Sequence, residues 1–210
     1  MSSRCPSCHR VLEEDAVCCA EVRHTWRCTR CSKLSQGFVV PYGKCYLCGG
    51  NIEVVEHYDV GDPARIFSIQ AAVQIEVDTY YFYKLALPRM QDREGAEVLE
   101  ELLEREQEHL KDLESNYHVK LDPKVLDPSE PAVRAIESEL FSDLQLDASD
   151  TAQKIYEKAM ELEARAARFY ADRAKQLPEG TEKRICLELL AEEEEHIALL
   201  ETELANLTRP

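Results

Sequence analysis

Residues 106 to 109 read Glu-Gln-Glu-His, and residues 193 to 196 read Glu-Glu-Glu-His. Both stretches place a histidine three residues after a glutamate, in a chain of 210 residues that contains only 6 histidines. A shift of 87 positions superposes the two stretches without a gap, and the same shift places Glu76 on Glu163. The sequence therefore predicts an internal duplication in which each half carries one Glu-x-x-His motif.

The apolar residues around both motifs recur with the period of an α-helix. Caps and breaks, such as Asp62-Pro63 and Pro178-Glu179-Gly180, delimit the helices. The two halves become two helical hairpins, joined by a segment of about 30 residues that carries a minor helix. This order is typical of a mainly α, ferritin-like four-helix bundle with one long crossover. The four long helices are expected at residues 62–88, 92–116, 149–177 and 181–207.

The two hairpins bring their carboxylates to matching heights. Glu76 and Glu106 lie about 14 and 16 residues from the turn near residue 90, and Glu163 and Glu193 lie about 16 and 14 residues from Glu179. Carboxylates and imidazoles of this kind suit two iron or manganese ions. A solvated acidic face is the alternative for a single motif, but two motifs at one offset favour metal. The predicted metal-binding and catalytic residues are Glu76, Glu106, His109, Glu163, Glu193 and His196.

Tyrosines accompany the predicted ligands. Tyr80 and Tyr83 follow Glu76 on the same helix face, and Tyr170 repeats the position of Tyr83. Their hydroxyls either donate hydrogen bonds to ligating carboxylates or only accompany aromatic core packing. The sequence leaves these two interpretations open.

Charge and cysteine change together near residue 60. Residues 1–60 carry 7 Lys/Arg and 7 Asp/Glu, so the net charge of −16 belongs to residues 61–210. Eight of the nine cysteines precede residue 49. We therefore expect a Cys-rich metal ribbon at 1–60 and the helical bundle at 61–210. No membrane span or signal peptide is recognisable, which predicts a cytoplasmic protein, and the acidic bundle excludes nucleic acid as a partner.

The ribbon is expected to bind metal through two Cys-x-x-Cys motifs. Cys28, Cys31, Cys45 and Cys48 can close one tetrahedral site, for which iron and zinc are both suitable. A second set of cysteines, here called the front group, precedes these motifs: Cys5, Cys8, Cys18 and Cys19, with His9 or His24 as a further ligand. The front group is either a second zinc site or a set of surplus buried thiols. Cys186 is expected to be a core residue.

The helical part resembles the rubrerythrin branch of the ferritin-like superfamily. The resemblance rests on E-x-x-T-x-x-F-Y at 76–83, E-x-x-A-x-x-F-Y at 163–170 and the two Glu-x-x-His motifs. It implies a di-iron protein that reduces peroxide, with a rubredoxin-like iron site and a homodimeric state. Two positions depart from the family pattern. Ala166 stands where typical rubrerythrins have a further ligating glutamate, so the remaining six ligands are closer to those of ferritins and bacterioferritins, which oxidise ferrous iron. Ser32 stands where rubredoxin-like motifs usually have a glycine after the second cysteine.

Two function classes follow from these observations. In the first, a di-iron oxidoreductase reacts with peroxide or dioxygen, and the ribbon relays electrons from an unknown donor. In the second, the bundle binds or stores iron, and a structural zinc ribbon contacts other proteins. Ferric thiolate colour in the purified protein would favour the first class.

Overall fold

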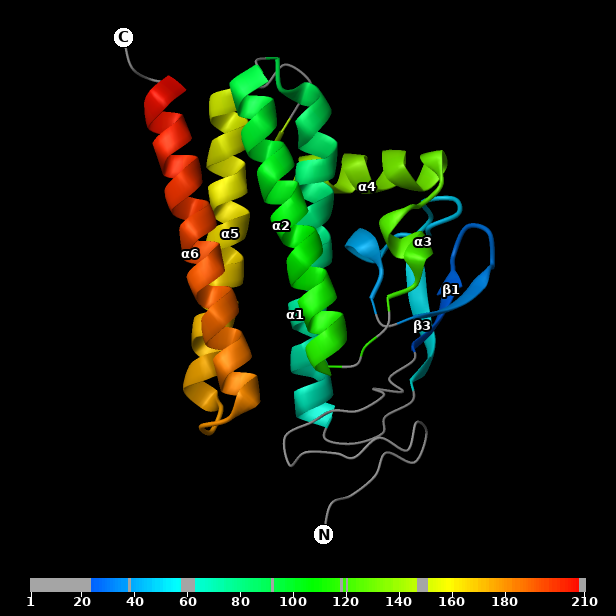
Figure 1. The fold of residues 1–210 in the computed structure, drawn as a ribbon. Coiled ribbons are helices and arrows are strands. Elements are labelled where there is room, and N and C mark those ends of the chain that lie inside the picture. Colours follow the sequence, from blue (N-terminus) through cyan, green and yellow to red (C-terminus); the bar gives the residue numbers. More distant parts are fainter. Residues whose placement is uncertain are drawn as a thin grey trace. The chain divides into compact units, whose positions relative to one another are not determined.

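The chain is mainly helical, and its described residues include a small antiparallel sheet (Figure 1). The computed structural model describes residues 24–37, 39–57, 63–91, 93–117, 119, 121–146 and 151–207. The elements are β1 (His24–Cys28), β2 (Leu34–Gly37), η1 (Pro41–Gly43), β3 (Ile52–His57), α1 (Pro63–Ala86), η2 (Leu87–Arg89), α2 (Arg93–Tyr117), α3 (Pro123–Leu126), α4 (Glu130–Asp143), α5 (Ala152–Gln176) and α6 (Thr181–Leu207).

The four long predicted helices are present, with ends that differ by a few residues. Helix α1 ends at Ala86 and passes into the short helix η2, where Pro88 removes a backbone donor. Helix α5 begins after Thr151 rather than at Ser149-Asp150. The described part of the crossover contains two helices, α3 and α4, where one minor helix was predicted. Asp122 explains the additional one, because its side chain caps α3 by accepting a hydrogen bond from the Lys124 amide at 3.0 Å.

The chain divides into two compact units, and the division passes through α1, α2 and α4. The first unit takes the described residues up to Val77 together with Leu110–Glu139. The second unit takes Asp78–His109 and the described residues from Leu140 onward. Each unit is described by itself below.

In the first unit, the sheet has the order β2-β1-β3 and both pairings are antiparallel. Trp26 of β1 pairs with Ser35 on one side and with Val54 on the other. Cys28 ends β1, so the sheet fixes the first residue of the first Cys-x-x-Cys motif. The second motif lies between Lys44 and Asn51, which form an isolated bridge.

The second Cys-x-x-Cys motif of the first unit packs against the crossover. Ser129, just before α4, donates from its amide to the Tyr46 carbonyl at 2.9 Å and from its hydroxyl to the Leu47 carbonyl at 2.6 Å. The buried Lys44 donates to Glu139 of α4 at 2.8 Å. The crossover residues from Ser129 to Glu139 therefore form part of the ribbon's surroundings.

Gly49 allows the close approach of α4. A Cβ atom at Gly49 would lie 2.3 Å from the Ala135 Cβ and 2.6 Å from the Pro131 carbonyl oxygen. Its φ of +67° is also a conformation that glycine adopts readily. A larger residue here would displace α4 from the motif.

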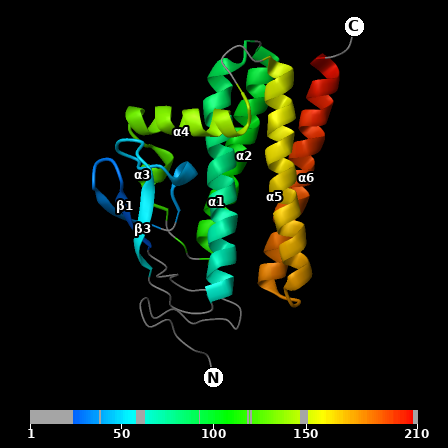
Figure 2. The ribbon, with the colours of Figure 1, turned by 180° about the vertical axis from the view of Figure 1, so that it is seen from behind.

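In the second unit, α5 and α6 run side by side, as both views of the ribbon show (Figures 1 and 2). Arg173 and Glu182 form a largely buried ion pair of 3.0 Å across the turn that joins these helices. The end of α1 and the start of α2 belong to the same unit. Its largest fully buried side chains include Tyr81, Phe82, Tyr83, Leu99, Leu102, Tyr156 and Tyr170.

Candidate metal centres

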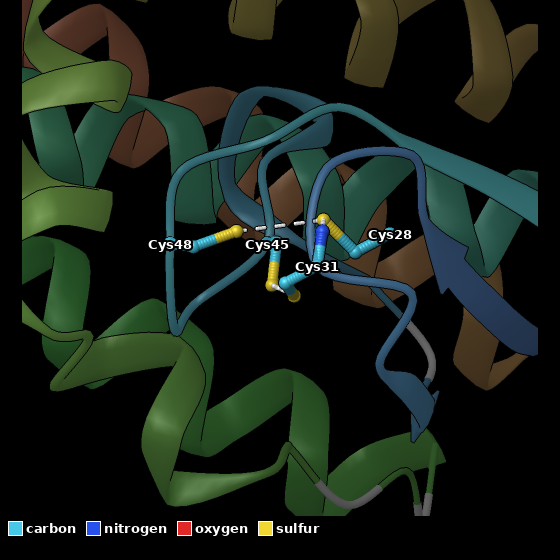
Figure 3. Close-up of side chains that lie close together, drawn as sticks. All are labelled: Cys28, Cys31, Cys45 and Cys48. Carbon is cyan, nitrogen blue, oxygen red and sulfur yellow. Dashed lines mark hydrogen bonds between the residues drawn. The ribbon is translucent and has the colours of Figure 1, made fainter.

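The four predicted ribbon cysteines come together in the first unit. Their sulfur atoms point toward one another (Figure 3) and lie within 4.8 Å of one another. The Sγ atoms of Cys28 and Cys48 are 3.5 Å apart, and those of Cys31 and Cys45 are 4.0 Å apart. A tetrahedral metal with bonds of about 2.3 Å to sulfur sets its sulfurs about 3.8 Å apart. The cluster therefore fits one ion, and Cys31 is its most exposed ligand.

Three of the ribbon cysteines have shifted pKa values, and the shifts differ in direction. Burial raises the pKa of Cys28, but hydrogen bonds from the amides of Cys31 and Arg30, with neighbouring sulfurs, lower it to about 7. Burial and the neighbouring thiols raise the pKa of Cys48 to about 12. Burial also raises the pKa of Cys45. Four crowded thiolates need a cation to coexist, which is the condition that a bound metal satisfies.

The second cysteine of each motif is followed by a residue with positive φ. These residues are Ser32, with φ of 58°, and Gly49, with φ of 67°. The Ser32 amide donates to the Cys28 carbonyl at 3.0 Å, which closes the turn. Ser32 thus takes a left-handed conformation of the kind that glycine adopts readily.

The front group lies outside the described residues. It was predicted at Cys5, Cys8, Cys18 and Cys19, with His9 as a further ligand. The backbone of His24 belongs to β1, but its side chain is not among those described. Cys186 is a core residue, as predicted, with 4% of its surface exposed.

A second cluster, of glutamates and histidines, is buried in the second unit. Glu106, Glu163, Glu193 and His196 place one ligand atom each within 4.8 Å of the others. Their exposed fractions are 0%, 0%, 1% and 4%. Helices α2, α5 and α6 contribute these side chains. Carboxylates and an imidazole at such distances could bind a metal ion.

Glu106 and Glu193 each lie between two histidines. Glu106 approaches His196 Nδ1 with Oε1 at 3.4 Å and His109 Nδ1 with Oε2 at 3.8 Å. Glu193 approaches His109 Nδ1 with Oε1 and His196 Nδ1 with Oε2, both at 3.5 Å. The two oxygens of each carboxylate thus face different imidazoles. This is the arrangement in which a carboxylate can bridge two ions.

The cluster favours positive charge at His196. Burial lowers the pKa of His196, but the interactions with Glu163 and Glu193 outweigh it and raise this pKa to about 10. In the same way, burial raises the pKa of Glu163, but its interactions with Glu193, His196 and Tyr83 lower it below the usual value. Among the described residues, Glu163 Oε2 and His196 Nε2 are buried without a hydrogen-bond partner. Buried polar atoms of this kind fit a metal site.

The predicted tyrosines differ in their contacts. The Tyr83 hydroxyl donates a hydrogen bond to Glu163 Oε1, and both side chains are fully buried. Burial, followed by the charges of Glu163 and Glu106, raises the pKa of Tyr83 well above its usual value, so the hydroxyl keeps its proton. Tyr80 packs edge to face against Tyr81. Tyr170 is buried, with its ring edge to face against Phe169.

Two further positions that the sequence analysis singled out are buried. Glu76 lies on α1 in the first unit and has no exposed surface. Ala166 lies on α5 with 1% of its surface exposed.

Sequence reasoning missed Glu192. The run from Glu192 to Glu195 suggested an exposed face, and Glu194 and Glu195 are indeed exposed. Glu192, however, places Oε2 2.7 Å from Nε2 of the buried His109. No pattern of residue types distinguishes it from its neighbours.

Comparison of the chain with protein-family models, with curated proteins and with solved structures found no match. Among the described residues, no helix is both long enough and apolar enough to cross a membrane.

Proposed function

We propose that the protein is a non-haem di-iron oxidoreductase of the rubrerythrin type, which reduces peroxide or dioxygen with oxidation of ferrous iron. The observation that carries this proposal is the placement of Glu106 and Glu193, whose carboxylate oxygens each face both His109 and His196. Bridging carboxylates flanked by one imidazole per ion are the arrangement used by di-iron bundles.

The charge of the cluster supports two divalent ions. Glu106, Glu163 and Glu193 are buried, and the imidazoles of His109 and His196 approach their carboxylates. Glu76 is a fourth buried carboxylate, and the 87-residue offset relates it to Glu163. Four carboxylates balance the charge of two divalent ions, and neutral imidazoles complete the coordination. We therefore retain all six residues as the proposed ligand set.

When bound, two ferrous ions would supply the two electrons that, with two protons, convert one hydrogen peroxide into two waters. Tyr83 would hold the Glu163 carboxylate in place, since its hydroxyl donates to Oε1 and retains its proton. The stacked imidazoles of His109 and His196 would complete the coordination of the two ions.

The fold that suits this function is the ferritin-like four-helix bundle with one long crossover. Its support is the hairpin of α5 and α6, the short link between α1 and α2, and the long segment between Tyr117 and Ala152. We propose a homodimer in the cytoplasm, with an electron donor whose identity stays open.

The ribbon has two proposed roles, which depend on its metal. Iron in the four-cysteine cluster would relay single electrons to the di-iron centre, and the exposure of Cys31 gives a donor access to one ligand. Zinc there would make the ribbon a structural and protein-contact module beside an iron-binding or iron-storing bundle. The packing of the Cys45-x-x-Cys48 motif against α4 favours a structural contribution from either metal.

Iron stoichiometry and oxidation kinetics test the proposal. Protein loaded anaerobically with ferrous iron should hold two ions in the bundle, measured after the ribbon metal is assigned from the visible spectrum. Mixing with peroxide or dioxygen in a stopped-flow instrument should then oxidise both ions. Fewer than one bundle ion per chain would rule out the di-iron centre, and two ions without turnover would select the storage alternative.

A further inference from the structure

Glu192 connects the buried cluster of the second unit to solvent. Its side chain is 46% exposed, while His109, 2.7 Å away, is only 2% exposed. The contact joins Glu192 Oε2 to His109 Nε2 at ion-pair distance, so the carboxylate lies against the outer nitrogen of the ring. The nearby residues Glu194 and Glu195 are exposed.

The two nitrogens of His109 face different groups. Nδ1 lies 3.5 Å from Glu193 and 3.8 Å from Glu106, so it is the nitrogen directed at the proposed ions. Nε2 lies 2.7 Å from Glu192 Oε2. A ligating histidine commonly donates its other N–H to a carboxylate, which fixes the tautomer and raises the basicity of the ligating nitrogen.

Within the described part of the chain, His196 has no such outer carboxylate. Its Nδ1 faces Glu106, Glu163 and Glu193, and no carboxylate of the described residues lies at ion-pair distance from its Nε2. In the internal repeat, the position equivalent to Glu192 is Arg105, which contacts Glu101 at 3.5 Å. The repeat is therefore broken at the residue that precedes each Glu-x-x-His motif.

We propose that Glu192 is a positioning residue that orients His109, and that it makes the two metal positions unequal, the one beside His109 binding more tightly. The inference rests on the proposed di-metal cluster. Outer partners of this kind typically contribute about 10- to 100-fold to metal affinity. The position beside His196, where the repeat has Arg105, receives no such contribution.

Titration of the metal-free full-length chain with cobalt(II) measures this inequality without enzymatic turnover. The ribbon is first loaded with zinc, so that cobalt absorption reports only the bundle. The unmutated protein should bind two cobalt ions in two steps, the first at least about tenfold tighter. Glu192→Gln should weaken the tight step about tenfold and leave the second step in place.

Two further variants separate positioning from general charge. Glu195→Gln removes the same charge from an exposed position of α6 and should leave both steps unchanged. Arg105→Glu restores the repeat and should tighten the weak step, so that the two affinities converge.

Each outcome decides one question. Two equal steps in the unmutated protein, or identical titrations for Glu192→Gln and Glu195→Gln, would overturn the role of Glu192 while leaving the di-metal cluster intact. Binding of fewer than one cobalt ion to the bundle would overturn the cluster and the inference together.

Discussion

The imidazoles of His109 and His196 are stacked, with ring centroids 5.3 Å apart and planes inclined by 14°. The two residues come from α2 and α6, and each belongs to one Glu-x-x-His motif. Parallel rings at this spacing direct both Nδ1 atoms toward Glu106 and Glu193. The internal repeat of the sequence thus becomes an approximate symmetry of the cluster.

Removal of either ring should affect one ion more than the other. We expect His109→Ala and His196→Ala each to weaken one of two bundle ions, because each imidazole faces the cluster through a single nitrogen. Anaerobic iron titration measures the remaining stoichiometry. Full retention of two equally tight ions in both variants would contradict the assignment of these histidines as ligands.

Substitution of the residue that follows the second cysteine should stabilise the ribbon in the first Cys-x-x-Cys motif and destabilise it in the second. Ser32→Gly should stabilise the ribbon by about 0.5–1 kcal/mol, because glycine adopts positive φ without the steric strain that serine incurs. Gly49→Ala should destabilise it by more, since the added Cβ meets Ala135 and Pro131. Chelator-driven release of the ribbon metal measures both effects. Equal release rates for the two variants would contradict this account.

Loss of the ribbon metal should leave the bundle ions in place. Cys28→Ser removes one of four sulfurs from the four-cysteine cluster, whereas the cluster of Glu106, Glu163, Glu193 and His196 lies wholly in the second unit. A chain shortened to residues 61–210 should likewise fold and retain bundle iron. Metal analysis of both proteins checks this, and loss of bundle iron from Cys28→Ser would contradict it.

The shortened chain should nevertheless change at α4. Ser129 and Glu139 lose their partners at Tyr46, Leu47 and Lys44 when the ribbon is absent. We expect faster amide exchange in residues 130–139 than in the full chain. Unchanged exchange there would show that α4 does not depend on the ribbon.

Ala166→Glu should shift the preferred oxidant from dioxygen toward peroxide. An additional carboxylate beside the two ions would stabilise the ferric state and offer another bridging mode. The same side chain is a buried charge at a position with 1% exposure, so the metal-free variant should unfold at lower temperature than the iron-loaded one. Stopped-flow oxidation by each oxidant decides the first part. An unmutated protein already selective for peroxide would show that Ala166 does not set the preference.

Cys186 should stay a thiol at neutral pH. Burial, with a smaller contribution from Glu182, raises the pKa of its thiol from 9.0 to about 11. Because the folded state holds this proton more tightly than a free cysteine, its contribution to stability is present below pH 9.0 and is lost as the pH rises toward about 11. Iodoacetamide should modify Cys186 slowly at about neutral pH in the folded chain and rapidly after denaturation. Rapid labelling of the folded chain would contradict this.

The helices and part of the cluster could be predicted from the sequence because they depend on short-range regularities. Apolar periodicity and caps locate α1, α2, α5 and α6, and the rarity of histidine makes the repeated Glu-x-x-His motif informative. The structure brings together Glu106, Glu163, Glu193 and His196, and His109 contacts two of them. The inclusion of Glu76 stays a prediction.

Two features could not be predicted because they depend on which face of a helix meets which neighbour. Four consecutive glutamates at 192–195 are chemically alike, and only the rotation of α6 turns Glu192 toward His109. The packing of Gly49 against α4 joins residues that are distant in the sequence. Small residues at Ala132 and Ala135 were the available signal, but alanine is too common in helices to indicate a partner.

Helix α4 constrains how the crossover can change in length during evolution. Its first part contacts Gly49 through Pro131, Ala132 and Ala135, and its last part buries Leu140 and Phe141. Each residue of an α-helix advances the direction of its side chain by about 100°. A single insertion or deletion between Ala135 and Leu140 would turn one of these faces away from its neighbours. Natural variants should therefore place their insertions before Ser129 or after Leu146, and the long connection is a fixed spacer rather than a tolerant loop.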